Sequence, residues 1–129
     1  AHVGDSRAYH LRDGQLRQLS VDHSFVAELV AMGKITAEEA RTHQNRNLLM
    51  QALGLGRPLD VDRLAIELVP GDRVLLCSDG LYDLVADHEI EAAMASADDP
   101  ATLCHELIAL ANERGGSDNI TVISARVDA

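Results

Sequence analysis

The sequence predicts an α+β fold in which short, mainly antiparallel strands and helices follow one another in blocks. Three observations lead to this expectation. Asp13-Gly14 is a two-residue turn signal between two candidate strands, as in a β-hairpin. The run from 74 to 77 is apolar and bounded by turn residues, which is typical of a buried strand. Leu103, Leu107 and Leu110 recur at the spacing of one helix face.

The first half of the chain should hold this hairpin and then a helical insertion. We predict the hairpin over residues 6–19. A helix is predicted over 24–32, where an apolar stretch runs up to a glycine. Thr36 followed by Glu39 matches a capping box, so a second, short helix should follow. Residues 24–58 therefore form the expected helical insertion between strands.

The second half should begin with a pair of strands. Leu64, Ile66 and Leu68 alternate with other residues, which predicts a half-buried strand. A turn at 70–72 leads into the run 74–77, which we expect to be buried on both faces. These two strands should form a second hairpin.

Two helices and a strand are expected to complete the chain. Asp87 is a candidate N-cap for a helix that runs to about residue 95. Asp99 precedes a proline, and this pair predicts a helix start because proline fits the first helical position. That helix should end at Gly115, and the mostly apolar stretch 120–127 should form the last strand.

Composition narrows the class of function. Hydrophobic residues make up 47% of the chain, so it can build a core and is not a disordered acidic tail. The formal net charge of −10 argues against a nucleic-acid partner, since phosphate binding needs clustered Lys and Arg. The six histidines lack the closed Cys/His spacing of a zinc site. Cys77 and Cys104 lack a Cys-x-x-Cys partner, which predicts free thiols in a reducing, cytoplasmic setting. No apolar run approaches 18 residues, so no membrane segment is expected.

Three aspartates stand out as candidate metal ligands. Asp79 follows the apolar run and precedes a glycine, and Asp118 lies between a Gly-Gly pair and the last strand. Asp5 lies in a Gly-Asp-Ser-Arg turn. Carboxylates are hard oxygen donors suited to Mg²⁺ and Mn²⁺. The plain alternatives are that Asp79 only shapes its turn and that Asp118 only bonds its own backbone. Asp5 could likewise only fix its turn or pair with Arg7.

A set of short motifs follows in order along nearly the whole chain. They are 1–9 (Ala-His-Val-Gly-Asp-Ser-Arg-Ala-Tyr), 22–24 (Asp-His-Ser), 33–36 (Gly-Lys-Ile-Thr), 52–54 (Ala-Leu-Gly), 71–81 (Gly-Asp-Arg-Val-Leu-Leu-Cys-Ser-Asp-Gly-Leu) and 116–121 (Gly-Ser-Asp-Asn-Ile-Thr). Each motif is weak alone, whereas their order and spacing together are highly specific. In this respect the chain resembles the PPM family of metal-dependent protein serine/threonine phosphatases, also called type 2C, and most closely its bacterial-type members.

The resemblance implies an antiparallel β-sandwich flanked by helices, with an active site at one edge that holds two to three Mn²⁺ or Mg²⁺ ions. It implies that Asp79 and Asp118 are ligands of one ion of the central pair, and that Asp5 is a ligand of a peripheral third ion. The implied activity is hydrolysis of phosphoserine and phosphothreonine in proteins, including Ser/Thr kinases and their substrates, by a metal-activated water.

The chain departs from the family pattern at its start. The family's early acidic ligand, its basic phosphate-binding residue and its Asp-Gly-x-Gly-Gly-His segment, which supplies a candidate general acid, have no counterpart here. Residues 1–129 are therefore expected to be the C-terminal part of one phosphatase domain, lacking its N-terminal strands and helices, with a flap at about 24–58. We expect the parent protein to be active and this chain alone to be inactive or nearly so. An unpaired sheet edge could lead to self-association.

The flap offers further candidates for contact with substrate. His23 and Arg46 are candidate substrate-binding residues, and Arg41 and Arg57 lie in the same region. Local hydrogen bonding for His23 and a solvated charge for the arginines are the alternatives. For the protein as a whole, the alternative function is a non-catalytic binding or regulatory module on the same fold.

Overall fold

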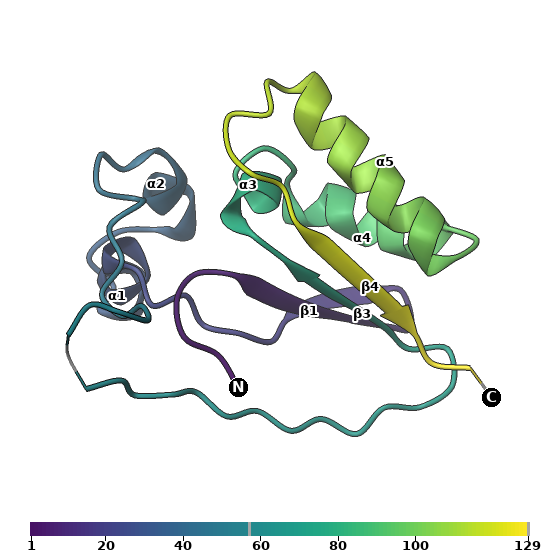
Figure 1. The fold of residues 1–129 in the computed structure, drawn as a ribbon, viewed down its shortest axis with the longest axis horizontal. Coiled ribbons are helices and arrows are strands. Elements are labelled where there is room, and N and C mark those ends of the chain that lie inside the picture. Colours follow the sequence, from purple (N-terminus) through teal and green to yellow (C-terminus); the bar gives the residue numbers. More distant parts are fainter. Residues whose placement is uncertain (57, 129) are drawn as a thin grey trace. The chain divides into compact units, whose positions relative to one another are not determined.

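The computed structural model describes residues 1–56 and 58–128, and the chain divides into two units. The first unit comprises Ala1–Ser6 and Ser20–Leu64, and the second comprises Arg7–Leu19 and the chain from Ala65 on. In chain order the elements are β1 (Arg7–Arg12), β2 (Gln15–Gln18), α1 (Phe25–Ala31), α2 (Ala37–Thr42), β3 (Arg73–Cys77), α3 (Asp79–Tyr82), α4 (Asp87–Ser96), α5 (Pro100–Glu113) and β4 (Val122–Arg126) (Figure 1).

A four-stranded antiparallel sheet in the order β2-β1-β3-β4 is the centre of the second unit, which confirms the α+β class. The hairpin of β1 and β2 is formed as predicted. Its turn residues Asp13 and Gly14 have φ values of 52° and 74°, and a type I′ turn requires positive φ at both positions. β3 pairs with β1 on one side and with β4 on the other, so both of its edges are used.

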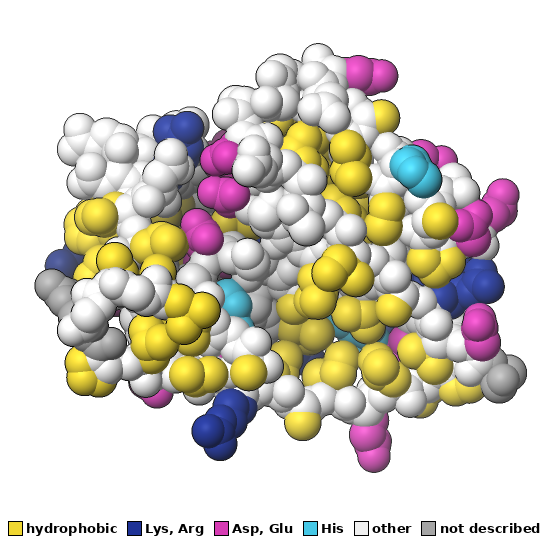
Figure 2. Space-filling view, viewed as in Figure 1, with side chains coloured by type: hydrophobic (Ala, Val, Ile, Leu, Met, Phe, Trp, Pro, Cys, Tyr) yellow, Lys and Arg dark blue, Asp and Glu magenta, His cyan; other side chains and the backbone are white. Residues whose placement is uncertain are grey.

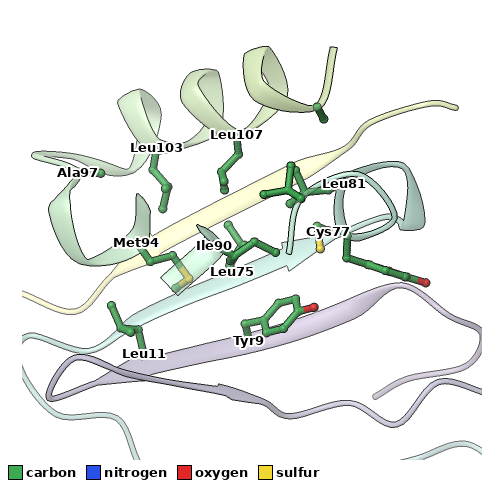
Figure 3. Close-up of a cluster of buried hydrophobic side chains, with 13 residues drawn as sticks. Tyr9, Leu11, Leu75, Cys77, Leu81, Ile90, Met94, Ala97, Leu103 and Leu107 are labelled. Carbon is green, nitrogen blue, oxygen red and sulfur yellow. The ribbon is translucent and has the colours of Figure 1, made fainter. Parts of the chain in front are cut away.

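The core of this unit lies between one face of the sheet and the helices α4 and α5 (Figures 1 and 3). Tyr9 and Leu75 are cross-strand partners on this face, and both are fully buried. Leu103 and Leu107 extend from α5 into the same cluster, as the helical spacing predicts. The buried cluster is Tyr9, Leu11, Leu75, Cys77, Leu81, Tyr82, Val85, Ile90, Met94, Ala97, Leu103, Leu107 and Ala111.

Two of the predicted helix starts are present with their capping bonds. Thr36 Oγ1 accepts from the backbone N–H of Glu39 at 3.1 Å, and the Glu39 carboxylate accepts from the backbone N–H of Thr36 at 2.7 Å. Asp99 Oδ1 accepts from the backbone N–H groups of Ala101 and Thr102 at 2.9 and 3.0 Å. Both helices begin there because these side chains satisfy backbone donors that the helix itself leaves unpaired.

Asp87 is not the N-cap of α4, which corrects the sequence-based expectation. The helix begins at Asp87, and Ala86 occupies the N-cap position. The Glu89 carboxylate accepts from the backbone N–H of Ala86 at 3.0 Å, so a side chain of the helix itself pairs with this backbone donor. The Asp87 carboxylate instead accepts a hydrogen bond from the Tyr9 hydroxyl at 3.1 Å.

The strand predicted over 63–68, and its hairpin with 74–77, are also wrong. This segment is irregular, and its alternating side chains are exposed: Leu64 by 53%, Ile66 by 36% and Leu68 by 46%. Figure 2 shows hydrophobic side chains along the lower edge of the view, where the segment runs. Alternation of apolar and polar side chains indicates a segment that could lie half-buried. A strand also needs a neighbouring strand whose backbone pairs with its own N–H and C=O groups. β3 cannot be that neighbour because both of its edges are occupied.

β3 is buried on one face rather than on both. Leu75 and Cys77 lie in the core, whereas Leu76 between them is 45% exposed. Its cross-strand partner Ile123 on β4 is 58% exposed. The apolar run in the sequence therefore predicts the strand and not which of its faces is covered.

The first unit contains α1, α2 and the start of the chain. Two isolated β-bridges tie it together, one between His2 and Asp62 and one between Ser24 and Leu49. Both helices fall inside the predicted insertion 24–58. Among residues 1–56 and 58–128, no helix has the length and apolar character needed to cross a membrane.

Candidate metal centre

Asp79 is placed by the end of β3. The strand ends at Cys77, whose side chain is buried in the core, and the chain turns through Ser78 into α3, which begins with Asp79. The Asp79 carboxylate is half-buried, and its Oδ1 accepts from the backbone N–H of Gly80 at 2.9 Å. The buried strand therefore fixes the backbone from which this carboxylate emerges.

Asp118 is placed by the turn that follows α5. Gly115 and Gly116 have φ values of 118° and 50°, a region that favours glycine. At Gly116 a Cβ atom would also lie 2.6 Å from Oδ1 of Asn112. Asp118 is exposed in the loop beyond, and its Oδ1 accepts from the backbone N–H of Asn119 at 2.7 Å.

Ser78 bonds the two acidic segments to each other. These are residues 78–81, which include Asp79, and residues 115–121, which include Asp118. Its backbone N–H donates to the Thr121 carbonyl at 3.1 Å, and its hydroxyl accepts from the Thr121 N–H at 3.0 Å. The hydroxyl also donates to the Asn119 carbonyl at 3.0 Å. A serine at the N-cap position, as here before α3, usually caps its own helix, but this hydroxyl joins two loops instead. Sequence analysis gave Ser78 no role.

Gly80 allows the two segments to pack closely. A Cβ atom at this position would lie 2.4 Å from the Asn119 carbonyl oxygen and 3.0 Å from its carbonyl carbon. Glycine is therefore needed here for the approach of another backbone, and not for an unusual φ. The Asp-Gly pair that looks like a turn signal in the sequence is thus the contact point between the two loops.

The carboxylates carried by these two hydrogen-bonded segments suit a hard divalent cation. Each aspartate uses Oδ1 for the next backbone N–H, and within the described part of the chain neither Oδ2 atom has a hydrogen-bond or ion-pair partner. Carboxylate oxygens are preferred ligands of Mg²⁺ and Mn²⁺. A cluster of three or more His, Cys, Asp or Glu side chains that could hold a metal ion is absent from residues 1–56 and 58–128. Within the described residues, the candidate ligands of this centre are therefore limited to Asp79 and Asp118.

Asp5 lies in the first unit, in a turn that His23 holds. The His23 backbone N–H donates to the Gly4 carbonyl at 2.8 Å, and the Gly4 N–H donates to His23 Nδ1 at 3.2 Å. Since Nδ1 accepts, Nε2 carries the proton of the neutral ring and donates to Asp62 Oδ2 at 3.0 Å. Both ring nitrogens of His23 thus make local hydrogen bonds, and a substrate-binding role for this residue stays a prediction.

The arginines predicted to meet substrate are placed as follows. Arg46 is exposed in the turn after α2, and its backbone N–H donates to the His43 carbonyl at 3.1 Å. Arg41 is exposed near the end of α2. Arg57 lies outside the described residues. Contact of Arg46 with a substrate remains a prediction.

The comparisons with known proteins identify the group to which the chain is similar. The family model described as Stage II sporulation protein E (SpoIIE) matches residues 6–128. The serine/threonine protein phosphatase PstP of Mycobacterium tuberculosis is 48% identical over 126 residues, which are 98% of this chain and 24% of that protein. The serine/threonine phosphatase stp of Listeria welshimeri is 42% identical over 95% of this chain and 49% of its own length.

Solved structures agree in fold. The crystal structure of M. tuberculosis PstP/Ppp has a TM-score of 0.92 at 46% identity, covering 99% of this chain and 54% of that one. The catalytic domain of PstP in complex with two manganese ions has a TM-score of 0.88 at 45% identity, covering 99% of this chain and 52% of that one. The chain thus spans about a quarter to a half of these curated and solved relatives. With residues 6–128 matched by the family model, the chain belongs to the SpoIIE group of bacterial PPM-type serine/threonine phosphatases, as the order of its motifs predicts.

Proposed function

We propose that the intact protein is a Mn²⁺- or Mg²⁺-dependent phosphatase of phosphoserine and phosphothreonine proteins, and that Asp79 and Asp118 are ligands of one ion of a central pair. The observation that carries this proposal is the bonding of the two acidic segments through Ser78, with one oxygen of each carboxylate left without a partner in the described structure. The phosphatase names of the relatives and the two manganese ions of the PstP complex support it.

The residues of this chain would act by holding their carboxylates in place. Asp79 is anchored by β3 and by the Gly80 N–H, and Asp118 by the Asn119 N–H. Divalent ions at such a site supply an acidified water and stabilise the attacking and leaving oxygens of an in-line phosphoryl displacement. No side-chain nucleophile is required, and the thiol of Cys77 is buried in the core.

The remaining assignments rest on the family resemblance. We assign Asp5 to a peripheral third ion, and residues 24–58 to a flap in which His23 and Arg46 meet the phosphoprotein. The turn that His23 holds around Asp5 supports the first of these assignments because it fixes the backbone of the carboxylate. Residues 1–129 then form the C-terminal part of a single phosphatase domain.

We also propose that this chain alone is inactive or nearly so. Two aspartates supply few of the oxygen ligands that a pair of six-coordinate ions requires. The further ligands and the general acid would come from the remainder of the domain, since the chain spans only about half of the PstP catalytic domain.

The test is hydrolysis of an aryl phosphate and of a phosphothreonine peptide by the full-length gene product. We expect activity with Mn²⁺, its loss with a chelator and its return when Mn²⁺ is restored. Asp79→Asn should remove the activity, whereas Asp13→Asn should not, because asparagine tolerates the positive φ of this exposed turn residue. A gene product that is folded and binds partners but hydrolyses neither substrate would favour the non-catalytic alternative.

A further inference from the structure

A second set of contacts joins the other ends of the two acidic segments. Arg114 directly follows α5 and precedes the Gly-Gly turn that leads to Asp118. Its Nη1 donates to the carbonyl of Leu84 at 2.8 Å, just after α3, the helix that Asp79 begins. Nη1 and Nη2 also donate to the Glu89 carboxylate, at 2.7 and 2.5 Å. The guanidinium therefore joins the start of the Asp118 segment to the chain that follows the Asp79 segment.

Glu89 completes this arrangement from α4. Its Oε2 accepts from the backbone N–H of Ala86, two residues beyond Leu84, while both oxygens accept from Arg114. The Arg114 guanidinium and the Ala86 N–H lower the pKa of the Glu89 carboxyl to about 2. Glu89 is therefore ionised throughout the neutral range, and the pair is a charged, bidentate one, a geometry that adds specificity as well as energy.

The two acidic segments are consequently joined by hydrogen bonds at both of their ends. At one end Ser78 bonds to Asn119 and Thr121, and at the other Arg114 bonds to the carbonyl of Leu84. Asp79 lies between Ser78 and Leu84, and Asp118 lies between Arg114 and Asn119. Segments that are bonded at both ends have less freedom to move apart than segments bonded at one end.

We propose that Glu89 and Arg114 are positioning residues of the metal centre, which set the spacing of the Asp79 and Asp118 carboxylates by joining the ends of the two acidic segments and so tune the affinity for the divalent cation. This inference rests on the proposed function. Neither residue is expected to touch the ion or the substrate. Their contribution should be modest, because the side chains of Arg114 and Glu89 are 37% and 28% exposed and surface ion pairs are weak.

The experiment compares Mn²⁺ affinity among variants of the full-length gene product, measured by calorimetry at a temperature where each variant is folded. Glu89→Gln keeps an acceptor for the Ala86 N–H but loses the charge, and Arg114→Lys keeps the charge but loses the bidentate fork. We expect each to weaken Mn²⁺ binding by about three- to fivefold, the size that fits a partly exposed pair. The double variant should be little weaker than either single one.

A matched control separates positioning from general stability. Arg12→Gln breaks another bidentate pair, with Asp72, at the opposite end of β3 from Asp79. It should lower the melting temperature at least as much as Glu89→Gln does, and leave Mn²⁺ affinity unchanged. If Glu89→Gln and Arg114→Lys bind Mn²⁺ as tightly as Arg12→Gln does, the positioning role is wrong. If the unaltered protein shows no Mn²⁺ binding that Asp79→Asn removes, the proposed function itself fails.

Discussion

Two aspartates stand at the two ends of the same five-residue strand, and the structure uses them in opposite ways. Asp72 directly precedes β3 and is buried, with 1% of its surface exposed. Its carboxylate accepts from Arg12 through both oxygens and from the backbone N–H of Val69. Asp79 follows β3, is half-buried, and uses one oxygen on the next backbone N–H. Both oxygens of Asp72 are hydrogen-bonded within the fold, whereas one oxygen of Asp79 has no partner in the described structure.

The two carboxylates differ in their partners, although both belong to aspartates that flank the same strand. The hydrogen bonds from Arg12 outweigh the opposing effect of burial and hold the pKa of Asp72 well below its usual range. The charge of Asp72 is therefore satisfied within the protein. Asp72 is buried whereas Arg12 is 39% exposed, so the cost of breaking the pair falls mainly on the buried side. Asp79 has no comparable cation in the described structure, as the proposed role of a metal ligand requires.

The largest expected effect lies at the Asp79 end and is functional. Asp118→Asn in the full-length gene product should lower Mn²⁺-dependent hydrolysis of an aryl phosphate by at least about 100-fold. Mutation of a residue that only supports a metal ligand already lowers metal affinity or activity by about 10- to 100-fold. Its melting temperature without metal should change by less than about 2 °C, because the exposed side chain bonds only to its own loop. Unchanged hydrolysis by this variant would remove Asp118 from the metal centre.

The next effect lies at the Asp72 end and is structural. Asp72→Asn leaves Arg12 without its charged partner, and we expect the melting temperature to fall by about 10 °C. Mn²⁺ affinity of the folded protein should stay the same, because the change lies at the far end of β3. Thermal unfolding and Mn²⁺ calorimetry on the same sample measure both quantities. A variant that retains its melting temperature and loses metal would reverse the roles assigned to the two ends.

Gly80→Ala, at the Asp79 end, should lower both the stability of the fold and the affinity for Mn²⁺. Its Cβ would meet the Asn119 carbonyl oxygen at 2.4 Å, so the two acidic segments must move apart. We expect a loss of about 1–3 kcal/mol in the free energy of unfolding, as for other overpacked sites, together with weaker Mn²⁺ binding. Chemical denaturation and calorimetry test this together. Stability lost with full retention of Mn²⁺ affinity would show that the contact at Gly80 does not set the metal centre.

The smallest effect is a dependence of stability on pH. The pKa of Glu89 is about 2 in the folded protein against an ordinary value of 4.5, so its contribution is present above about pH 4.5 and is lost as the pH falls toward 2. Glu89→Gln should therefore flatten the loss of stability between these pH values, as followed by urea unfolding. An identical slope in both proteins would show that the pair with Arg114 contributes nothing to folding.

Local signals allowed much of the fold to be predicted. The Asp13-Gly14 hairpin and the Asp99 cap are formed because the residues that specify them are neighbours in the sequence. The strand over 63–68 is not formed, since alternation carries no information about whether a partner strand is available. An apolar run carries no information about which strand face is covered, so the run 74–77 does not reveal that Leu76 would be exposed.

The candidate site was predictable in its aspartates and not in its supports. Asp79 and Asp118 stand in motifs that can be recognised in the sequence. The hydrogen bonds of Ser78 span 41 and 43 residues, and the contact between Arg114 and Leu84 spans 30, so no local pattern encodes them. Gly80 offered the best available signal, because a glycine after a candidate ligand also marks a place where another backbone approaches.

The most direct test of the account is a double-mutant cycle on Mn²⁺ affinity with Asp79→Asn and Asp118→Asn in the full-length gene product. If both carboxylates hold the same ion, each single change should weaken binding by at least about tenfold, and the double change should cost far less than the product of the two. Two effects that multiply fully, or a single change that leaves Mn²⁺ affinity intact, would show that the two aspartates do not share a metal ion.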